Sequence, residues 1–125
     1  MGQHGTTFGG GPLACRVALE VLDIIEELLP DIRETGAYLH SKLRQLQQRT
    51  PQIAEVRGLG MMAGLQLTTS ADEPVQRALE RGLLINCTHD TVIRLLPPFI
   101  TTKAEVDEAL ENLAAVCAEV QGCAV

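Results

Sequence analysis

The chain has 125 residues, a formal net charge of −6 at pH 7 and an apolar fraction of 46%. This is the length of one domain, and it suffices to bury a hydrophobic core. Two Phe, one Tyr and no Trp leave few aromatic faces on which bases could stack, and an acidic chain offers phosphate backbones little positive surface. The composition therefore argues against binding to nucleic acids and to anionic membranes.

The sequence also bears on the compartment. No basic region followed by an apolar run comes after Met1, and the unbroken apolar stretches are far shorter than a membrane span. The cysteines show no metal-clip or Cys-x-x-Cys spacing, so we expect no metal site and mostly small, reduced core residues of a cytoplasmic protein. They are Cys15, Cys87, Cys117 and Cys123.

The first predicted elements are two helices. After a glycine-rich stretch over residues 1–11, Pro12 takes the place of a first helical residue. Apolar residues then recur at helical spacing until Pro30 interrupts the pattern. Asp31 can cap a second helix, which continues to about Arg49 before a Thr-Pro dipeptide ends it.

Four strands and two more helices are predicted in the rest of the chain. Gly82 suits a helix C-cap, and Thr102 with Glu105 forms a capping box for the last helix. The expected order is strands 53–57 and 61–67 around a glycine turn, a helix 72–81, strands 83–87 and 91–96, and a final helix. This order predicts an α+β fold, a small, mainly antiparallel sheet covered by helices on one face.

The glycine-rich opening has features of an anion site. The Thr6 and Thr7 hydroxyls and several glycines precede a helix start, where backbone N–H groups and the helix dipole favour an anion such as phosphate. It is not a Walker loop, because no Lys-Ser/Thr follows. A flexible chain start is the alternative, and the residues alone leave both open.

Arg94 is the second candidate, because it lies inside the apolar strand 92–96. An arginine on a half-buried strand needs an anionic partner, and a substrate carboxylate would match its fork geometry. An edge-strand arginine with its head in water is the equal alternative.

Other polar residues give weaker signals. Arg57 is expected to be a surface charge beside a turn, and the glycines after it lack the spacing of a dinucleotide-binding loop. His4 and His89 are expected in solvated loops, and His40 beside the apolar stripe of its helix in a structural role.

Several segments resemble the class III aminotransferases, which use pyridoxal 5'-phosphate. Residues 4–16, HGTTFGGGPLACR, resemble that family's HGTTFGGNPLACR segment, with Gly11 in place of its usual Asn. Residues 55–62 resemble its EVRGxGLM hairpin. Residues 81–88 and 92–98 are most similar to the acetylornithine aminotransferase branch, and the resemblance covers essentially the whole chain.

The resemblance implies the C-terminal region of a longer enzyme. Residues 1–29 would be the end of the large domain with the phosphate loop and a connecting helix, and residues 30–125 would be the C-terminal small domain of a fold-type I enzyme. The family's Schiff-base lysine would lie upstream. This chain would then contain no catalytic residue and would be inactive alone.

The resemblance also assigns roles. Thr7 would hold the cofactor phosphate, Thr6 would touch substrate, and their loop would reach the neighbouring subunit of a homodimer. Arg94 would bind a substrate carboxylate or pair with an active-site glutamate. The Gly11 replacement bears on the hydrogen bonding of this loop.

The implied reaction moves the δ-amino group of N2-acetylornithine to 2-oxoglutarate, a step of arginine biosynthesis. Ornithine, succinylornithine and other ω-amino acids remain alternative substrates. A free-standing, non-catalytic binding or interaction domain derived from such an enzyme is the other alternative.

Overall fold

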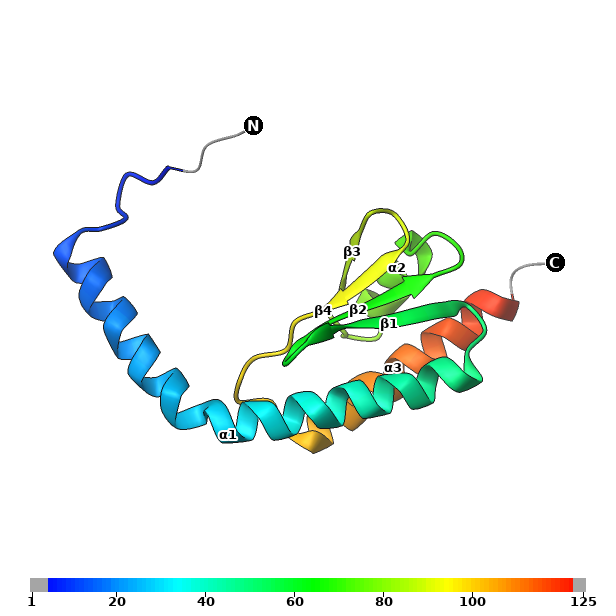
Figure 1. Cartoon of the computed structure of the whole chain (residues 1–125). Coiled ribbons are helices and arrows are strands. Elements are labelled where there is room, and N and C mark those ends of the chain that lie inside the picture. Colours follow the sequence, from blue (N-terminus) through cyan, green and yellow to red (C-terminus); the bar gives the residue numbers. More distant parts are fainter. Residues whose placement is uncertain (1–4, 123–125) are drawn as a thin grey trace. The chain divides into compact units, whose positions relative to one another are not determined.

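The computed structural model describes residues 5–122 of the chain and has the α+β architecture predicted from the sequence (Figure 1). Residue His4 of the family-like segment and Cys123 lie outside the described residues. The elements are α1 (Pro12–Arg49), β1 (Ile53–Leu59), β2 (Met62–Leu67), α2 (Asp72–Glu80), β3 (Asn86–Thr88), β4 (Val92–Leu95) and α3 (Lys103–Gly122). None of the helices in the described part is both long and apolar enough to cross a membrane.

The first helix differs from the prediction. Instead of two helices separated at Pro30, one helix runs without a break from Pro12 to Arg49 and contains this proline. The prediction of a break was wrong because proline removes only one backbone hydrogen bond, at a cost of about 3 kcal/mol. The residues after Pro30 are held helical by their buried face, which includes Leu39, Leu43 and Leu46.

The chain divides into two compact units after Pro30. In the first unit, the apolar residues of α1 are largely exposed; Leu13 is 79% exposed and Val17 54%. The second unit contains the sheet, α2, α3 and the rest of α1. The predicted apolar stripe of the first unit is therefore present but exposed, whereas the stripe of the second unit forms part of a core.

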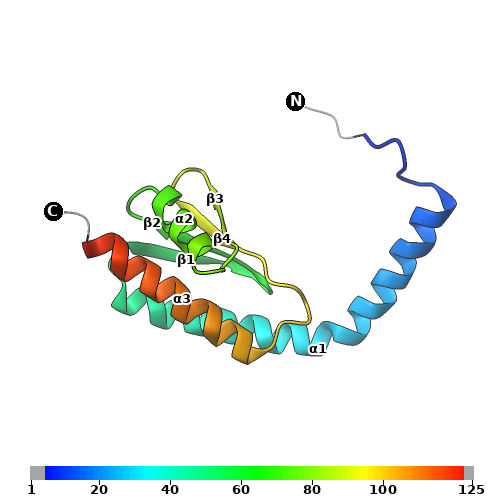
Figure 2. The same ribbon diagram turned by 180° about the vertical axis from the view of Figure 1, so that it is seen from behind.

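The sheet of the second unit has the order β1-β2-β4-β3, and every neighbouring pair is antiparallel. Figures 1 and 2 show α3 and the second part of α1 on the same face of it. The strand bounds shift from those predicted. β1 and β2 extend to a two-residue connection, Gly60-Met61, and β3 begins only at Asn86. Gly60 takes a left-handed φ of +58° there, a conformation that glycine adopts without steric cost.

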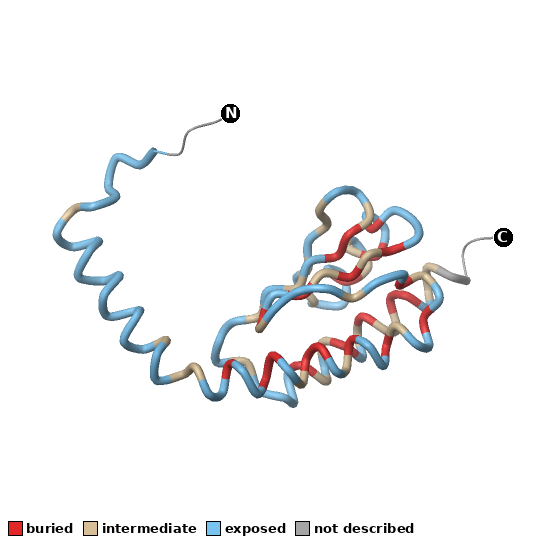
Figure 3. Tube along the Cα trace, viewed as in Figure 1, coloured by how far each residue is buried: buried red, intermediate tan, exposed pale blue. Residues whose placement is uncertain are grey.

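The core lies between the sheet and the two long helices, where the red segments of Figure 3 gather. Leu43 of α1, Leu65 of β2, Ile93 of β4 and Leu113 of α3 are each fully buried. Burying one such side chain contributes about 1.5–3 kcal/mol, so these four elements hold one another in place. Of the described cysteines, Cys117 is buried as expected and Cys87 partly so, whereas Cys15 is exposed.

The helix ends follow the local sequence signals. Gly82 has a φ of +79° just after α2, as the predicted C-cap requires. At the start of α3, the Thr102 backbone N–H donates to a Glu105 carboxylate oxygen at 2.8 Å, and the Glu105 N–H donates to the Thr102 hydroxyl at 3.3 Å. The capping box is therefore confirmed. These contacts also lower the pKa of the Glu105 carboxyl group.

The helix α1 touches the β1–β2 turn at a glycine. A Cβ atom added to Gly36 would lie 2.8 Å from the carbonyl oxygen of Gly60. That separation is shorter than a van der Waals contact, and the clashing atoms belong to backbone, which cannot rotate away. Glycine at position 36 thus allows the helix and the turn to approach each other.

We predict that Gly36→Ala destabilises the protein by about 1–3 kcal/mol, because the added methyl group forces the turn off the helix. Alanine normally stabilises a helix interior by about 0.5–1 kcal/mol relative to glycine, so the predicted sign is opposite to that of helix propensity. Urea unfolding measures the difference, with exposed Ala37→Gly as the propensity control. A Gly36→Ala protein with an unchanged or higher midpoint would contradict the close approach.

Candidate substrate and cofactor site

The threonine loop belongs to the first unit. Thr6 and Thr7 are exposed and precede α1, whose first turn contains no acidic residue. The Gly9 N–H donates to the Thr6 hydroxyl oxygen at 3.3 Å, which folds the loop back on itself. The Thr7 hydroxyl has no partner within the described residues. It is therefore available as a donor beside the positive end of a helix dipole.

Arg94 lies in the second unit, on β4. The prediction left open an edge position, but β4 is an interior strand between β2 and β3. The strand is half-buried as expected, because Val92 and Ile93 are buried, whereas the Arg94 side chain is exposed, as the alternative with its head in water had it. Its Nε donates to the Asn86 side-chain oxygen at 3.2 Å, whereas its two terminal nitrogens have no partner among the described residues.

The strand register gathers a row of polar residues across the sheet. Gly64 pairs with Arg57 on one side and with Arg94 on the other, and Arg94 pairs with Asn86. Directly paired residues point to the same side of a sheet, so this row faces away from the helices. The alternating row, with Val56, Leu65, Ile93 and Cys87, faces the core.

A hollow of about 320 Å³ lies on this outer face. Arg57, Gly64 and Arg94 line it, and Thr88 at the end of β3 and His89 of the β3–β4 turn contribute to its wall. A second hollow of about 360 Å³ is lined mainly by leucines and prolines. Its one ionisable residue, Glu105, is occupied in the helix cap, so the outer sheet face is the better candidate for binding a polar ligand.

Some of these residues were missed from the sequence. Arg57 was expected beside a turn but lies within β1, and neither Gly64 nor Asn86 was singled out. A two-residue turn at Gly60-Met61, had it been predicted, would have revealed them, because this turn pairs residue 57 with residue 64. The predicted turn over residues 58–60 implies a different pairing of the two strands from the one in the structure.

Among the residues that the structure describes, the histidines and acidic residues form no metal site. His40 is buried in α1, and its Nε2 atom has no hydrogen-bond partner among the described residues. His89 lies in the β3–β4 turn, with a φ of +52°. Within residues 5–122, no three His, Cys, Asp or Glu side chains gather closely enough to hold a metal ion.

Comparison with known families decides what this arrangement belongs to. The family model described as "Aminotransferase class-III" matches residues 1–117. The chain belongs to the class III aminotransferases. The family resemblance drawn from the motifs is thereby confirmed.

Individual members of the family are similar over nearly all of the chain. An acetylornithine aminotransferase of Methanocaldococcus jannaschii is 47% identical over 122 residues, which are 96% of this chain and 31% of that protein. An ornithine aminotransferase of a Geobacillus strain is 50% identical over 95% of this chain and 30% of its own length. The crystal structure of an acetylornithine aminotransferase from Elizabethkingia anophelis matches with a TM-score of 0.81 at 32% identity, covering 95% of this chain and 31% of that one. The chain thus spans about a third of the length of these relatives.

Class III aminotransferases use pyridoxal phosphate, and the threonine loop has donors that fit its phosphate group. The free Thr7 hydroxyl, the exposed loop and the acid-free first turn of α1 offer hydrogen bonds and a favourable dipole to an anion. Gly10, with a φ of +80°, has open space where a side chain would lie. The loop is therefore compatible with a phosphate ligand.

The two lysines are less suited to react with the cofactor. The Lys42 ammonium group contacts Asp107 at 2.8 Å and lies over the Tyr38 ring, and Lys103 pairs with Glu34. The hydrogen bond that Lys42 donates to Asp107 raises the pKa of Lys42, and the one that Lys103 donates to Glu34 raises the pKa of Lys103. Both amines thus remain protonated and poorly nucleophilic at neutral pH.

We predict that this chain alone gives no stoichiometric, borohydride-stable label on a single lysine after incubation with pyridoxal 5'-phosphate at pH 7.5. Protonated amines react slowly, so labelling should be low and shared by Lys42 and Lys103. Peptide mapping by mass spectrometry measures it. As a matched control, Asp107→Asn removes the partner of Lys42 and should raise labelling there but not at Lys103. Full labelling of one lysine in the unaltered chain would contradict the interpretation.

Proposed function

We propose that this chain is the C-terminal region of an aminotransferase that moves the δ-amino group of N2-acetylornithine to 2-oxoglutarate in arginine biosynthesis. The observation that supports it most is the 47% identity to an acetylornithine aminotransferase over 96% of the chain. Residues 1–29 would end the large domain and residues 30–125 would form the small domain, in accord with the division of the structure after Pro30. The reaction would take place in the cytoplasm.

Ornithine is the second candidate substrate. The 50% identity to the Geobacillus ornithine aminotransferase favours it, because this value is as high as that for the acetylornithine relatives. The two substrates differ by an acetyl group on the α-nitrogen, and the chain covers only about 30% of either relative. The residues that distinguish them would lie largely outside this chain.

Thr7 would hold the phosphate of pyridoxal phosphate. When bound, the cofactor supplies the electron sink for amino-group transfer. Thr7 would donate its free hydroxyl to the phosphate, and Thr6 would touch the substrate while its oxygen accepts the Gly9 N–H. In a homodimer this loop would serve the site of the neighbouring subunit. The amine that binds the cofactor would come from the part of the enzyme outside this chain.

Arg94 would bind a substrate carboxylate. Its Nε is held by Asn86, which leaves both terminal nitrogens directed to solvent or ligand. A guanidinium held in this way presents a planar fork that donates two parallel hydrogen bonds to a carboxylate. Arg94 would therefore orient the substrate, and it would not transfer protons, because its guanidinium stays protonated.

A substrate panel on the full-length enzyme tests the proposed reaction. We expect the highest kcat/KM with N2-acetylornithine, and lower values with ornithine and succinylornithine, at saturating 2-oxoglutarate. A preference for ornithine would replace the first candidate with the second. Amino transfer from none of the three would overturn the assignment to ω-amino acids.

We predict that Arg94→Ala in the full-length enzyme lowers kcat/KM for the carboxylate substrates but leaves cofactor affinity unchanged. Where the assembled site of the full-length enzyme excludes water, losing a charge-assisted interaction costs about 2–5 kcal/mol, which corresponds to about thirtyfold to several thousandfold. Steady-state kinetics and cofactor titration measure the two effects. Arg33→Ala, at an exposed position of α1, is the control. Unchanged kinetics in Arg94→Ala would give the residue a structural role only.

We predict that Thr7→Val weakens cofactor retention by about tenfold to a hundredfold, because a hydroxyl bonded to a charged phosphate contributes about 1.5–3 kcal/mol. A mixed dimer of this variant with a variant lacking the cofactor lysine tests the shared site at limiting cofactor. If the loop acts on the neighbouring subunit, one of the two sites is intact and activity returns to about half. No recovery, with mixed dimers present, would place the loop in the site of its own subunit.

A further inference from the structure

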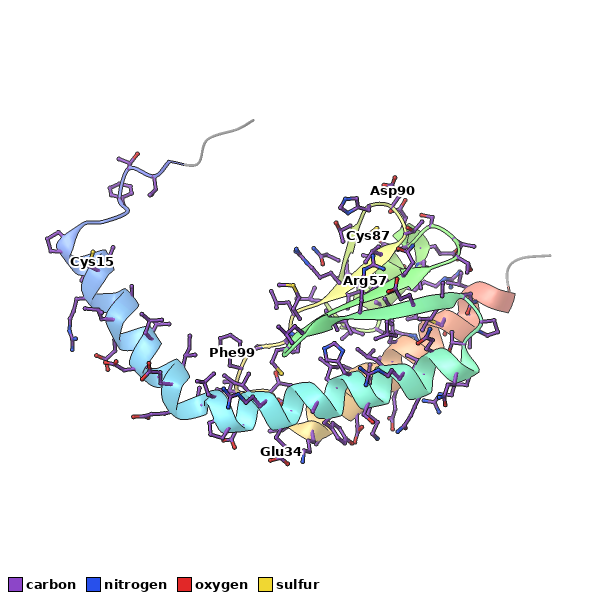
Figure 4. All side chains as sticks on the ribbon, in the orientation of Figure 1. Cys15, Glu34, Arg57, Cys87, Asp90 and Phe99 are labelled. Atoms are coloured by element: carbon purple, nitrogen blue, oxygen red, sulfur yellow. The ribbon has the colours of Figure 1, made fainter. Side chains whose placement is uncertain are left out.

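Two arginines share the outer face of the sheet although the chain as a whole is acidic. Arg57 on β1 and Arg94 on β4 both pair with Gly64 of β2, one on each side. Their Cα atoms are thus two strand spacings apart, about 10 Å. Figure 4 labels Arg57 on this sheet. Two like charges in one cross-strand row repel each other, and an anion between them relieves that repulsion.

Gly64 leaves space between the two side chains. A Cβ atom built there would already lie 3.7 Å from Cγ of Arg57 and 3.6 Å from a methyl group of Val92. A longer side chain would extend from there into the hollow of about 320 Å³ that both arginines line. The glycine therefore leaves open the part of this hollow that lies between the two arginines.

Each guanidinium is fixed from one side by the strands. Arg57 donates to the Glu55 carboxylate at 2.9 Å and to the side-chain oxygen of Gln66 at 3.2 Å. Gln66 is itself held by a bond of 2.7 Å from its amide nitrogen to the Thr91 hydroxyl. Arg94 is held by Asn86. A guanidinium has five N–H donors, so each arginine retains donors for a ligand.

From this geometry we propose that Arg57 and Arg94 together bind a dicarboxylate, with one carboxylate on each guanidinium and the carbon chain over Gly64. Two separate guanidinium groups suit a ligand with two separate carboxylates better than a single compact anion. The inference rests on the proposed function in that Arg94 is the carboxylate-binding residue there. It adds Arg57 as the second contact, so that the site selects dicarboxylates over monocarboxylates.

Glu55 sets the strength of the site. Its carboxylate occupies part of the Arg57 guanidinium and competes with the ligand for it. Both residues are exposed: the Arg57 side chain is 46% accessible and the Glu55 side chain 60%. We therefore expect weak binding in the isolated chain, and tighter binding once the Glu55 charge is removed.

The test is a titration of this 125-residue chain with glutarate at pH 7 and constant ionic strength, followed by NMR. The signals to follow are the Gly64 amide and the arginine Nε–H groups. We expect saturable shifts with glutarate. Acetate or inorganic phosphate, added at the same total concentration of negative charge, should give only weak, non-saturating shifts. Arg57→Gln and Arg94→Gln should each weaken glutarate binding by about three- to fivefold. Glu55→Gln should strengthen it, and Arg33→Gln should leave it unchanged.

The outcomes separate the inference from the proposed function. Weakening by Arg94→Gln but not by Arg57→Gln would overturn the paired site and leave Arg94 as a carboxylate-binding residue. Equal saturable binding of acetate or phosphate would also overturn the preference for dicarboxylates. The substrate panel on the full-length enzyme is independent of either result, since it tests which amino group is transferred.

Discussion

The register of the β1–β2 hairpin is the constraint on which the rest of the second unit depends. The connection Gly60-Met61 pairs residue 59 with residue 62, and the pairs follow from it as far as Glu55 with Gln66, beyond which a bulge shifts the register before Ile53. A slip of one residue would move all side chains of one strand to the opposite face, because the side-chain period of a strand is two. Leu65 would then leave the core, and Gly64 would no longer lie between the two arginines.

The same turn is tied to the helices. Gly36 lets α1 approach the carbonyl of Gly60, and Leu43 of the same helix lies in the core with Leu65 and Ile93. The helix therefore supports the turn that sets the register. Only one register places the apolar side chains of the strands in the core. Because helices cover one face of the sheet, Arg57 and Arg94 lie on the other face, where ligands have access.

The helix-covered side has its own polar contacts. The Tyr38 hydroxyl of α1 donates to Asp107 of α3 at 2.7 Å, and Lys42 contacts the same carboxylate. The hydrogen bonds from Lys42 and Tyr38 lower the pKa of Asp107, so the contact is ionic at neutral pH. Both lysines of the chain are thus occupied in joining helices, on the side of the sheet opposite to the arginine pair.

Much of the molecule was determined by local sequence. Pro12 begins a helix, Gly82 ends one, and the Thr102–Glu105 box begins another, because each signal acts through backbone groups only a few residues away. The family motifs are equally local, and they are enough by themselves to indicate the class III aminotransferases. Tertiary structure decided what depends on distant partners. Packing of the core kept α1 helical through Pro30 and placed Arg94 on an interior strand instead of an edge. It also paired Arg57 with Gly64 and Gly64 with Arg94, since strand register is chosen by the face that can be buried, and that choice involves residues from four separate elements.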